Sequence, residues 1–415
     1  MKPSSSPPEN KGHGHGEGQL RLMFFMNTIV RGGAEEHVLT LLRGLSRKYF
    51  QLSFVCPPIL ADEMRADLPS DVKLFPLRLR GLRDVAAAVH FAAILRRERV
   101  DILHSHLFYG SLFASPVAWA CGTSLILETG HGREHWRNGM VTSKFFVDRL
   151  AGRFVDGYIA VSEATGRYLQ ADKGLPGNKI SVIQNGCDLK RFAVSADSSR
   201  LKTSLGIADD EVVLVVPGRL EPQKGHRFLL QAMPLIEHRF PKTRLVCVGD
   251  GSLKPALEQM ASGLRLTKPV LFVGYQSNVH DWYGLADVIV MPSLYEGLPL
   301  VAIEALAASR PVVATAVDGT SEVIIDGMTG LSVPPENPEA LANAVCTLLA
   351  DPALRGGLAR KGHDWVWEKF TQERQIAQTQ DYYLAQWAMH GCKSSTPNEE
   401  QSRSSGTSPA LGIRN

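Results

Sequence analysis

Short apolar runs alternate with helix-length segments along most of the chain. The runs are rich in β-branched residues and have the length of buried strands. Seven runs precede a polar stretch at residues 193–199 and six follow it, covering residues 20–26, 51–55, 73–76, 102–105, 125–128, 157–161, 180–183, 212–217, 244–248, 270–273, 288–291, 311–315 and 331–333. This alternation is typical of α/β proteins, in which helices connect the strands of a parallel sheet.

The alternation starts again after the polar stretch, which predicts two doubly wound parallel sheets. A chain of 415 residues is long enough for two domains. We expect one Rossmann-like domain at residues 19–192, a second at 193–370, and a linker near 188–199. Loops at the carboxyl ends of the strands would then line a cleft between the two domains.

Both ends of the chain are rich in small polar residues. We therefore expect residues 1–18 and 392–415 to be disordered, and the first segment lacks the apolar core of a signal peptide. A helix is predicted at residues 372–389, where Trp387 and two tyrosines among apolar residues indicate a packing role.

The composition is that of a soluble globular protein, with 44% hydrophobic and 21% charged residues. The net charge of +3 gives no general affinity for nucleic acid. Six scattered cysteines, without paired metal-type spacing, favour a reduced cytoplasmic protein. The longest apolar region, residues 107–121, is too short and too interrupted to span a bilayer.

Two carboxylates, Glu296 and Glu304, follow the strand predicted at 288–291. We expect Pro299 to open a helix at its first position, so that Glu296 lies in the preceding loop and Glu304 on the helix. The free amides of Gly297 and Leu298, with the positive end of the helix dipole, would form an anion site suited to a phosphorylated sugar. The alternative is an ordinary helix start with a solvated Glu304.

A glycine-flanked loop follows the strand at 212–217 and carries two cations. Behind Gly218, Arg219 offers a bidentate fork and Lys224 a mobile point charge, and together they could grip a diphosphate leaving group. A solvated basic loop is the alternative interpretation.

Two further glycine turns end strands of the second half. Gly249 and Asp250 follow one strand, and Gly274 and Tyr275 follow the next. Such turns let the backbone approach a nucleotide, although glycines also serve simply to turn the chain.

In the first half, Gly33 opens the helix after the first strand, and three histidines lie at the ends of later strands. Gly33 follows the first strand and would allow close approach of a phosphate or acceptor, but the dinucleotide fingerprint is absent. We expect His131, flanked by glycines, to face the cleft and donate to a sugar hydroxyl or phosphate. For His104 and His106 a structural role is favoured.

No two aspartates are separated by a single residue anywhere in the chain. A metal-bridging Asp-x-Asp is therefore missing, and we predict a donor site that uses no divalent metal and no other cofactor.

In this order the motifs resemble those of the retaining glycosyltransferases of family four, also called glycosyl transferases group 1, in the GT-B class of two Rossmann-like domains. The resemblance is carried by Gly-Gly-Ala-Glu at 32–35, Ala-Val-Ser-Glu at 160–163, Asn-Gly-Cys-Asp at 185–188, Gly-Arg…Lys-Gly at 218–225, Gly-Asp-Gly at 249–251, the Glu-x7-Glu segment at 296–304, and Asp-Gly-Met-Thr-Gly-Leu at 326–331. It implies transfer of a hexosyl group from a nucleotide-diphosphate sugar to a saccharide or lipid-linked acceptor, in the synthesis of surface polysaccharide, lipopolysaccharide or glycolipid. It also implies that the first domain binds the acceptor and the second the donor, and that the final helix, at 371–391, returns to the first domain.

The resemblance also implies site roles. Arg219 and Lys224 would bind the donor diphosphate and Glu304 the ribose, while Glu296 would hold the sugar with the backbone of the segment Gly297, Leu298, Pro299 and Leu300. Gly33 would lie against phosphate or acceptor, and His131 against the sugar. Two departures stand out: Cys187 replaces an aliphatic residue, and Asp318 stands where the family commonly has glycine.

Basic residues gather in the first half of the chain in two groups. The first comprises Arg78, Arg80, Arg83, Arg96, Arg97 and Arg99, and the second lies around an aromatic stretch at 136–154 and comprises Arg133, Arg137, Lys144, Arg149 and Arg153. One interpretation is peripheral binding to an anionic membrane surface on the cytoplasmic side, and the other is a solvated basic face.

Two other functions remain open: a GT-B epimerase or hydrolase acting on a sugar nucleotide, and a non-catalytic sugar-nucleotide sensor.

Overall fold

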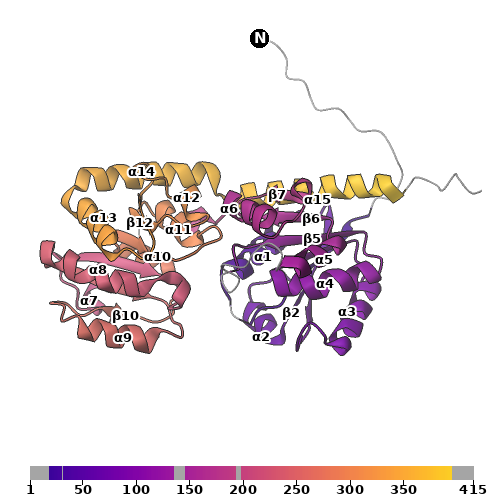
Figure 1. The fold of residues 1–415 in the computed structure, drawn as a ribbon, viewed down its shortest axis with the longest axis horizontal. Helices are drawn as coiled ribbons and strands as arrows, with labels where there is room; N and C mark the ends of the chain where they lie inside the picture. The colour runs from indigo at the N-terminus through magenta and orange to yellow at the C-terminus, as the bar shows by residue number, and fades with distance from the viewer. Residues whose placement is uncertain (1–17, 30, 135–144, 193–197, 395–415) are drawn as a thin grey trace, which may run out of the picture.

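The protein has two lobes, each built on a parallel sheet (Figure 1). The computed structural model describes residues 18–29, 31–134, 145–192 and 198–394. The expected disordered ends, apart from residues 18 and 392–394, lie outside the described residues, as do positions 193–197 of the linker and 136–144 of the aromatic stretch.

The first lobe holds a seven-stranded sheet in the order β3-β2-β1-β4-β5-β6-β7. Its strands are β1 Leu20–Met26, β2 Phe50–Cys56, β3 Lys73–Pro76, β4 Ile102–His106, β5 Leu125–Gly130, β6 Gly157–Ala160 and β7 Ile180–Val182. Its helices are α1 Gly33–Gly44, α2 Pro58–Met64, α3 Val85–Arg97, α4 Phe108–Ala120, α5 Phe146–Ala151 and α6 Glu163–Arg167.

The second lobe holds a six-stranded sheet in the order β10-β9-β8-β11-β12-β13. Its strands are β8 Val212–Pro217, β9 Thr243–Val248, β10 Leu271–Phe272, β11 Val288–Met291, β12 Val312–Thr315 and β13 Leu331–Val333. Its helices are α7 Ser198–Ser204, α8 His226–Arg239, α9 Lys254–Gly263, α10 Val279–Leu285, α11 Leu300–Ala307, α12 Thr320–Val323, α13 Pro338–Ala350 and α14 Pro352–Lys369. A last helix, α15 Gln372–Ser394, follows.

Both sheets are buried on two faces, which explains why their strands are continuous apolar runs. In β8, Val213 and Val215 belong to one core cluster while Leu214 and Val216 belong to another on the opposite face. The central strand β1 divides its side chains in the same alternating way. Two-sided burial under covering helices is characteristic of parallel sheets.

The prediction of two doubly wound parallel sheets is confirmed. In each sheet the strand order reverses beside the central strand, between β1 and β4 and between β8 and β11. Ligands of doubly wound folds bind outside the carboxyl ends of the strands at such reversal points.

Two details of the sequence analysis are wrong. The strand expected at 270–273 is reduced to Leu271–Phe272, because the chain then turns at Gly274, whose φ is +72°. Pro299 is not the first helical residue but caps α11, since its ψ of 107° is extended and its carbonyl accepts from the amide of Ala302 at 3.1 Å.

The last helix, α15, packs on the first lobe, whereas α14 covers the second (Figure 1). The hydroxyl of Tyr383 lies 2.6 Å from Nδ1 of His104, and the side chain of Tyr383 is fully buried. Gln375 accepts a hydrogen bond from the amide of Gly186 at 2.7 Å. The chain from 371 onward is therefore held against the first sheet.

The chain crosses between the lobes twice, and the two crossings lie side by side. The amide of Cys187 donates to the carbonyl of Phe370 at 2.9 Å, and the amide of Gln372 donates to the carbonyl of Cys187 at 3.0 Å. A methyl group on Gly186 would lie 2.2 Å from the carbonyl oxygen of Thr371, so only glycine permits this approach.

Within the described ranges, no helix combines the length and the apolar character that a bilayer span requires.

The contact between Tyr383 and His104 generates a stability prediction. Tyr383→Phe leaves a ring nitrogen of the buried His104 without its partner, which should lower the free energy of unfolding by about 1–3 kcal/mol. Tyr275→Phe is the control, because the Tyr275 side chain is exposed and should change stability by less than about 0.5 kcal/mol. Denaturant unfolding of both variants gives the comparison, and equal effects would show that α15 is not anchored through this contact.

Candidate active site

A cleft of about 900 Å³ lies between the lobes, at the carboxyl ends of strands from both sheets. This volume is in the range of small-molecule sites. Of the residues singled out from the sequence, the cleft is lined by Gly33, His131, Gly218, Arg219, Lys224, Glu296, Gly297, Leu298, Pro299, Leu300 and Glu304. Residues far apart in the sequence are thus gathered at one site.

Lys224 and Glu296 form an ion pair within the cleft wall. Nζ of Lys224 lies 2.6 Å from Oε1 of Glu296, and the Lys224 and Glu296 side chains are 16% and 7% exposed. Ser293 donates to the same carboxylate oxygen at 2.7 Å. The carboxylate is therefore fixed in place, while Lys224 keeps further ammonium protons for a ligand.

Arg219 extends from the loop after β8 toward the same region. Its guanidinium has a long contact of 3.4 Å with Oε1 of Gln223, whose own amide donates to the carbonyl of Tyr295 at 3.1 Å. Gln223 thus ties the loop that carries the two cations to the loop that carries Glu296.

The loop at Gly297 meets the first lobe by direct backbone contact. A methyl group on Gly297 would lie 1.9 Å from the carbonyl oxygen of His131, and one on Gly319 would lie 1.8 Å from the carbonyl oxygen of Gly297. Only residues without side chains allow these three backbone segments to stack. The position of His131 relative to Glu296 is fixed by this stacking.

Glu304 lies on α11, behind the capping residue Pro299. Its carboxylate accepts a hydrogen bond from the hydroxyl of Tyr283 at 2.6 Å. Burial raises the pKa of Glu304 above the usual range of a glutamate, and the Tyr283 hydrogen bond opposes that shift. A carboxylate held in this way can accept hydrogen bonds from vicinal hydroxyl groups of a ligand.

Asp318 occupies a left-handed conformation, with a φ of +38°. Glycine adopts this region most easily, so an aspartate here needs contacts that hold it in place. The Asp318 carboxylate accepts from the amide of Glu296 at 3.2 Å and lies 3.7 Å from Nε of Arg133 in the first lobe. Asp318 therefore adds an ionic link across the cleft.

Gly33 begins α1 on the opposite wall. Glu35 closes the helix start by accepting from the amide of Gly32 at 2.8 Å and from the hydroxyl of Thr28 at 2.5 Å. A methyl group on Gly33 would lie 3.8 Å from Cδ1 of Leu300, so the two helix starts face each other across the cleft.

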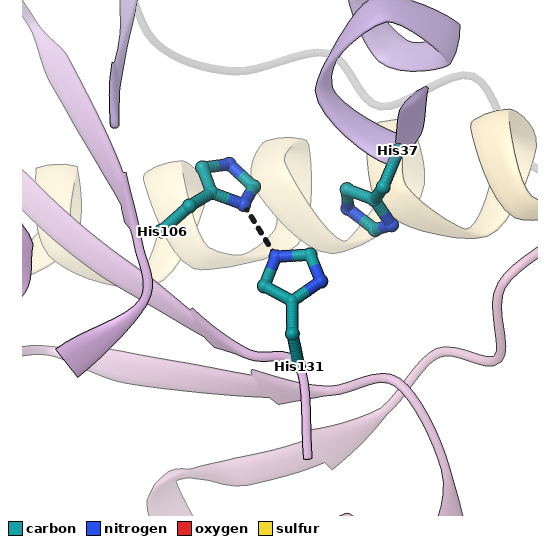
Figure 2. Close-up of side chains that lie close together, drawn as sticks. All are labelled: His37, His106 and His131. Atoms are coloured by element: carbon teal, nitrogen blue, oxygen red, sulfur yellow. Dashed lines mark hydrogen bonds between the residues drawn. The ribbon is translucent and has the colours of Figure 1, made fainter. Parts of the chain in front are cut away.

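His131 lines the cleft, as expected, and belongs to a buried group of histidines (Figure 2). Its Nε2 lies 3.0 Å from Nδ1 of His106. Burial lowers the pKa of His37 to about 4 and holds the pKa values of His106 and His131 well below 6.5, so these rings are neutral at neutral pH. His104 has the structural role expected, since both its nitrogens are hydrogen-bonded, to Tyr383 and Thr129.

Four predicted donor residues do not line the cleft. Gly249 and Gly274 instead bond to each other, with the amide of Gly249 donating to the carbonyl of Gly274 at 2.9 Å. Asp250 accepts from the amide of Gly251, and the side chain of Tyr275 is 76% exposed. Their contact with a donor stays a prediction.

Several residues of the site were not recognised from the sequence. Glu36, Asn185 and Tyr295 line the cleft, Tyr283 orients Glu304, and His37 approaches His131 with ring centroids 5.0 Å apart. Asn185 was noted only as part of a motif. His37 sits in a helix with ordinary amphipathic spacing, so no local signal marks it.

Two family models match the chain, one in each lobe. Residues 31–191 match Glycosyltransferase Family 4, and residues 211–351 match Glycosyl transferases group 1.

Relatives and solved structures agree with these matches. The chain is 31% identical over 276 residues to the GDP-mannose-dependent alpha-(1-6)-phosphatidylinositol monomannoside mannosyltransferase of Mycolicibacterium smegmatis, covering 63% of this chain and 72% of that protein. It is 23% identical over 377 residues to the UDP-Gal:alpha-D-GlcNAc-diphosphoundecaprenol alpha-1,3-galactosyltransferase of Escherichia coli, covering 88% and 95%. In fold it resembles Anabaena HepE in complex with UDP-glucose, with a TM-score of 0.76, 20% identity, and coverage of 88% of this chain and 100% of that one.

The site and these matches lead to one identification: the chain belongs to glycosyltransferase family 4, the glycosyl transferases group 1, and is a nucleotide-sugar-dependent glycosyltransferase of the retaining class.

Proposed function

We propose that this enzyme transfers a hexosyl group from a nucleotide-diphosphate sugar to a saccharide or lipid-linked acceptor, in the synthesis of surface polysaccharide, lipopolysaccharide or glycolipid. The observation that carries the proposal is that two cations, a glycine-containing loop and two carboxylates line the cleft together. Arg219 and Lys224 supply positive charge, the Glu296–Leu300 loop follows, and Glu304 lies on the helix behind it.

The positive charge suits the diphosphate. When the bond to the sugar breaks, negative charge grows on the departing phosphate oxygen, and preorganised cations stabilise that charge. Lys224 is already positioned by Glu296, so it loses little side-chain freedom when a donor binds. We therefore assign the diphosphate to Arg219 and Lys224 and expect no divalent metal to take part.

The sugar and ribose have separate partners in this proposal. The carboxylate of Glu296, held by Ser293 and Lys224, would accept hydrogen bonds from sugar hydroxyls, and Glu304 would accept them from the ribose. His131 would contact the sugar from the first lobe. Asp318 accepts from the backbone amide of Glu296 and would influence which sugar fits, because this donor is already engaged.

The relatives support a diphosphate donor without selecting its base. The mycobacterial enzyme is named for GDP-mannose, the Escherichia coli enzyme for UDP-galactose, and HepE was solved with UDP-glucose. Two of these names also refer to lipid-linked acceptors, phosphatidylinositol monomannoside and a diphosphoundecaprenol sugar. These parallels favour a lipid-linked acceptor, bound by the first lobe.

We further propose that the first lobe binds the cytoplasmic face of an anionic membrane. On α5, Phe146, Val147 and Leu150 are 62%, 51% and 44% exposed, and basic Arg149 lies among them. Trp119 on α4 is 62% exposed. Exposed apolar side chains beside basic ones are what interfacial binding requires.

The donor assignment is tested by comparing nucleotides that differ in phosphate number. Thermal-shift screening against nucleotide sugars first identifies the base, because a ligand of the native state raises stability. Arg219→Ala or Lys224→Ala should then weaken binding of the nucleoside diphosphate by about 10–100-fold and the monophosphate much less, as charge-assisted hydrogen bonds are lost. Arg227→Ala is the matched control, because Arg227 is exposed and pairs with Glu336.

Isothermal titration of these variants measures their affinities for the nucleoside diphosphate and monophosphate. Assays of donor turnover and of function in cells then distinguish the transferase from a hydrolase and from a sensor. Equal losses for diphosphate and monophosphate would contradict the assignment of the two cations. Release of free sugar from the donor without any acceptor would favour a hydrolase. A protein that binds the donor but never turns it over, with Glu296→Gln functionally silent in cells, would be a sensor.

Glu304→Gln should weaken nucleotide binding and stabilise the unliganded protein. Because the pKa of Glu304 is raised in the folded state, the folded protein holds a proton that the unfolded chain has released as pH rises, and its stability falls through that range. Glutamine lacks this titration, so the melting temperature of the variant should exceed that of the wild type at pH values above the ordinary glutamate pKa, increasingly so as pH rises.

The difference in melting temperature between Glu304→Gln and the wild type should shrink as pH falls below the ordinary glutamate pKa of about 4.3. At such pH the wild-type Glu304 carboxyl is protonated in both the folded and the unfolded state. Thermal unfolding across that range measures it, with the exposed Glu258→Gln on α9 as control. A pH-independent difference would mean that Glu304 does not titrate as described.

The membrane proposal predicts that Phe146→Glu with Leu150→Glu lowers binding to anionic vesicles by about tenfold or more, since two apolar contacts are lost. Leu235→Glu is the control, because Leu235 is 46% exposed on α8 of the other lobe. Vesicle flotation measures binding. Equal binding to neutral and anionic vesicles, or an equal loss with Leu235→Glu, would reject the proposal.

A further inference from the structure

Three histidines from separate segments lie close together beside the cleft, which His131 lines (Figure 2). His37 comes from α1, His106 ends β4, and His131 follows β5. One ring nitrogen from each lies within 4.8 Å of the others. They meet because β1, β4 and β5 are neighbours in the sheet and α1 starts from the end of β1.

We propose that His37, His106 and His131 form a binding site for a divalent transition metal of the zinc type. Imidazole nitrogens suit zinc, copper, nickel and cobalt ions, whereas magnesium prefers oxygen ligands. The site shares His131 with the sugar end of the proposed donor site but lies on the first lobe, away from Arg219 and Lys224, and it goes beyond the transferase function.

The ring positions fit a tetrahedral ion. Zn–N bonds of about 2.0–2.1 Å in tetrahedral geometry place the ligating nitrogens about 3.4 Å apart and the ring centroids about 5 Å apart. The observed centroid separations are 5.5 Å for His37 and His106, 5.0 Å for His37 and His131, and 5.3 Å for His106 and His131. Between His106 and His131 the nitrogens are 3.0 Å apart, so a metal would replace their hydrogen bond with a small separation of the rings.

The surroundings of His37 support a ligand role for its Nε2. This atom is buried and has no hydrogen-bond partner among the described residues. Nδ1 lies 2.7 Å from Oδ1 of Asn185 and 2.8 Å from Nε2 of Gln375, and these two contacts require opposite tautomers. Oε1 of Gln375 already accepts from the amide of Gly186, so Gln375 donates to Nδ1 and Nε2 carries the hydrogen when no ion is bound. Metal binding at Nε2 would select the other tautomer, in which Nδ1 donates to Asn185, an outer partner of the kind found at metal-binding histidines.

Three protein ligands leave a fourth position open. Sites with this composition bind water or a ligand at the open position, unlike closed structural sites with four protein ligands. Of the three histidines only His131 lines the cleft, so the metal would lie on the first-lobe side, below the Gly297 loop.

The test is metal binding by the full-length chain without any substrate. All proteins carry His13→Ala and His15→Ala, because these two terminal histidines could bind zinc by themselves. Titration with a competing chromophoric chelator should give one Zn²⁺ per chain and no comparable Mg²⁺ binding. His37→Asn should lower the Zn²⁺ affinity by about 100-fold or more, and Asn185→Ala by about 10–100-fold, as expected for an outer partner.

Two histidines serve as controls. His104 lies next to the cluster, with its ring centroid 4.2 Å from that of His106, but both its nitrogens are engaged, so His104→Gln should leave Zn²⁺ affinity unchanged. The exposed His90→Asn is a control whose folding is not at risk. Thermal unfolding without metal shows whether each variant is folded.

A spectroscopic measurement keeps the proposal testable if the variants fail to fold. Co²⁺ bound at this site should give the intense visible bands of tetrahedral coordination, and these bands should disappear on addition of Zn²⁺. Absence of stoichiometric Zn²⁺ binding, an octahedral Co²⁺ spectrum, or unchanged affinity in folded His37→Asn would overturn the site and leave a hydrogen-bonded histidine network. These outcomes are independent of transferase activity, which the donor-binding experiments test separately.

Discussion

The site depends on a close backbone contact between the two lobes. At Gly297 the second lobe touches the carbonyl of His131, and Gly319 supports the same loop from behind. A single methyl group at either glycine would overlap a carbonyl oxygen, so the distance between the cleft walls is set by the absence of side chains. The groups assigned to the sugar and to its acceptor are consequently brought together without any intervening side chain.

Electrostatics then gives each wall a different character. On the second lobe, Lys224 and Glu296 hold each other in place while Arg219 makes only a long contact. On the first lobe, burial keeps the histidines neutral. An anionic donor is therefore attracted to one wall, whereas the other can offer uncharged hydrogen-bonding groups to a neutral sugar or acceptor.

The fold was largely predictable because strands that are buried on both faces appear in the sequence as continuous apolar runs. The runs at β1, β3, β8, β11 and β13 were located to the residue. Cleft residues that follow strand ends, such as Arg219 and Glu296, were also found, because parallel strands present their carboxyl ends at one edge. The exact helix start at Pro299 was missed, since φ of proline is fixed but ψ is not.

What could not be predicted depends on distant segments meeting. His37 and Tyr283 have no local signal, because a buried polar residue on a helix looks like any other until its partner is known. The opposite case occurs at the four glycine-turn residues Gly249, Asp250, Gly274 and Tyr275. Their local pattern predicts contact with a nucleotide, but they lie outside the cleft lining. Periodicity reports burial, whereas a site also requires knowledge of which loops face each other.

The paired crossings at Cys187 and Thr371 have a mechanical consequence. Because the two crossings are hydrogen-bonded to each other, they form one connection between the lobes. We expect any relative movement of the lobes to pivot at this connection. Because Gln375 and Tyr383 tie α15 to the first lobe, the histidine cluster would keep its internal geometry through such a movement, and only its distance from the Gly297 loop would change.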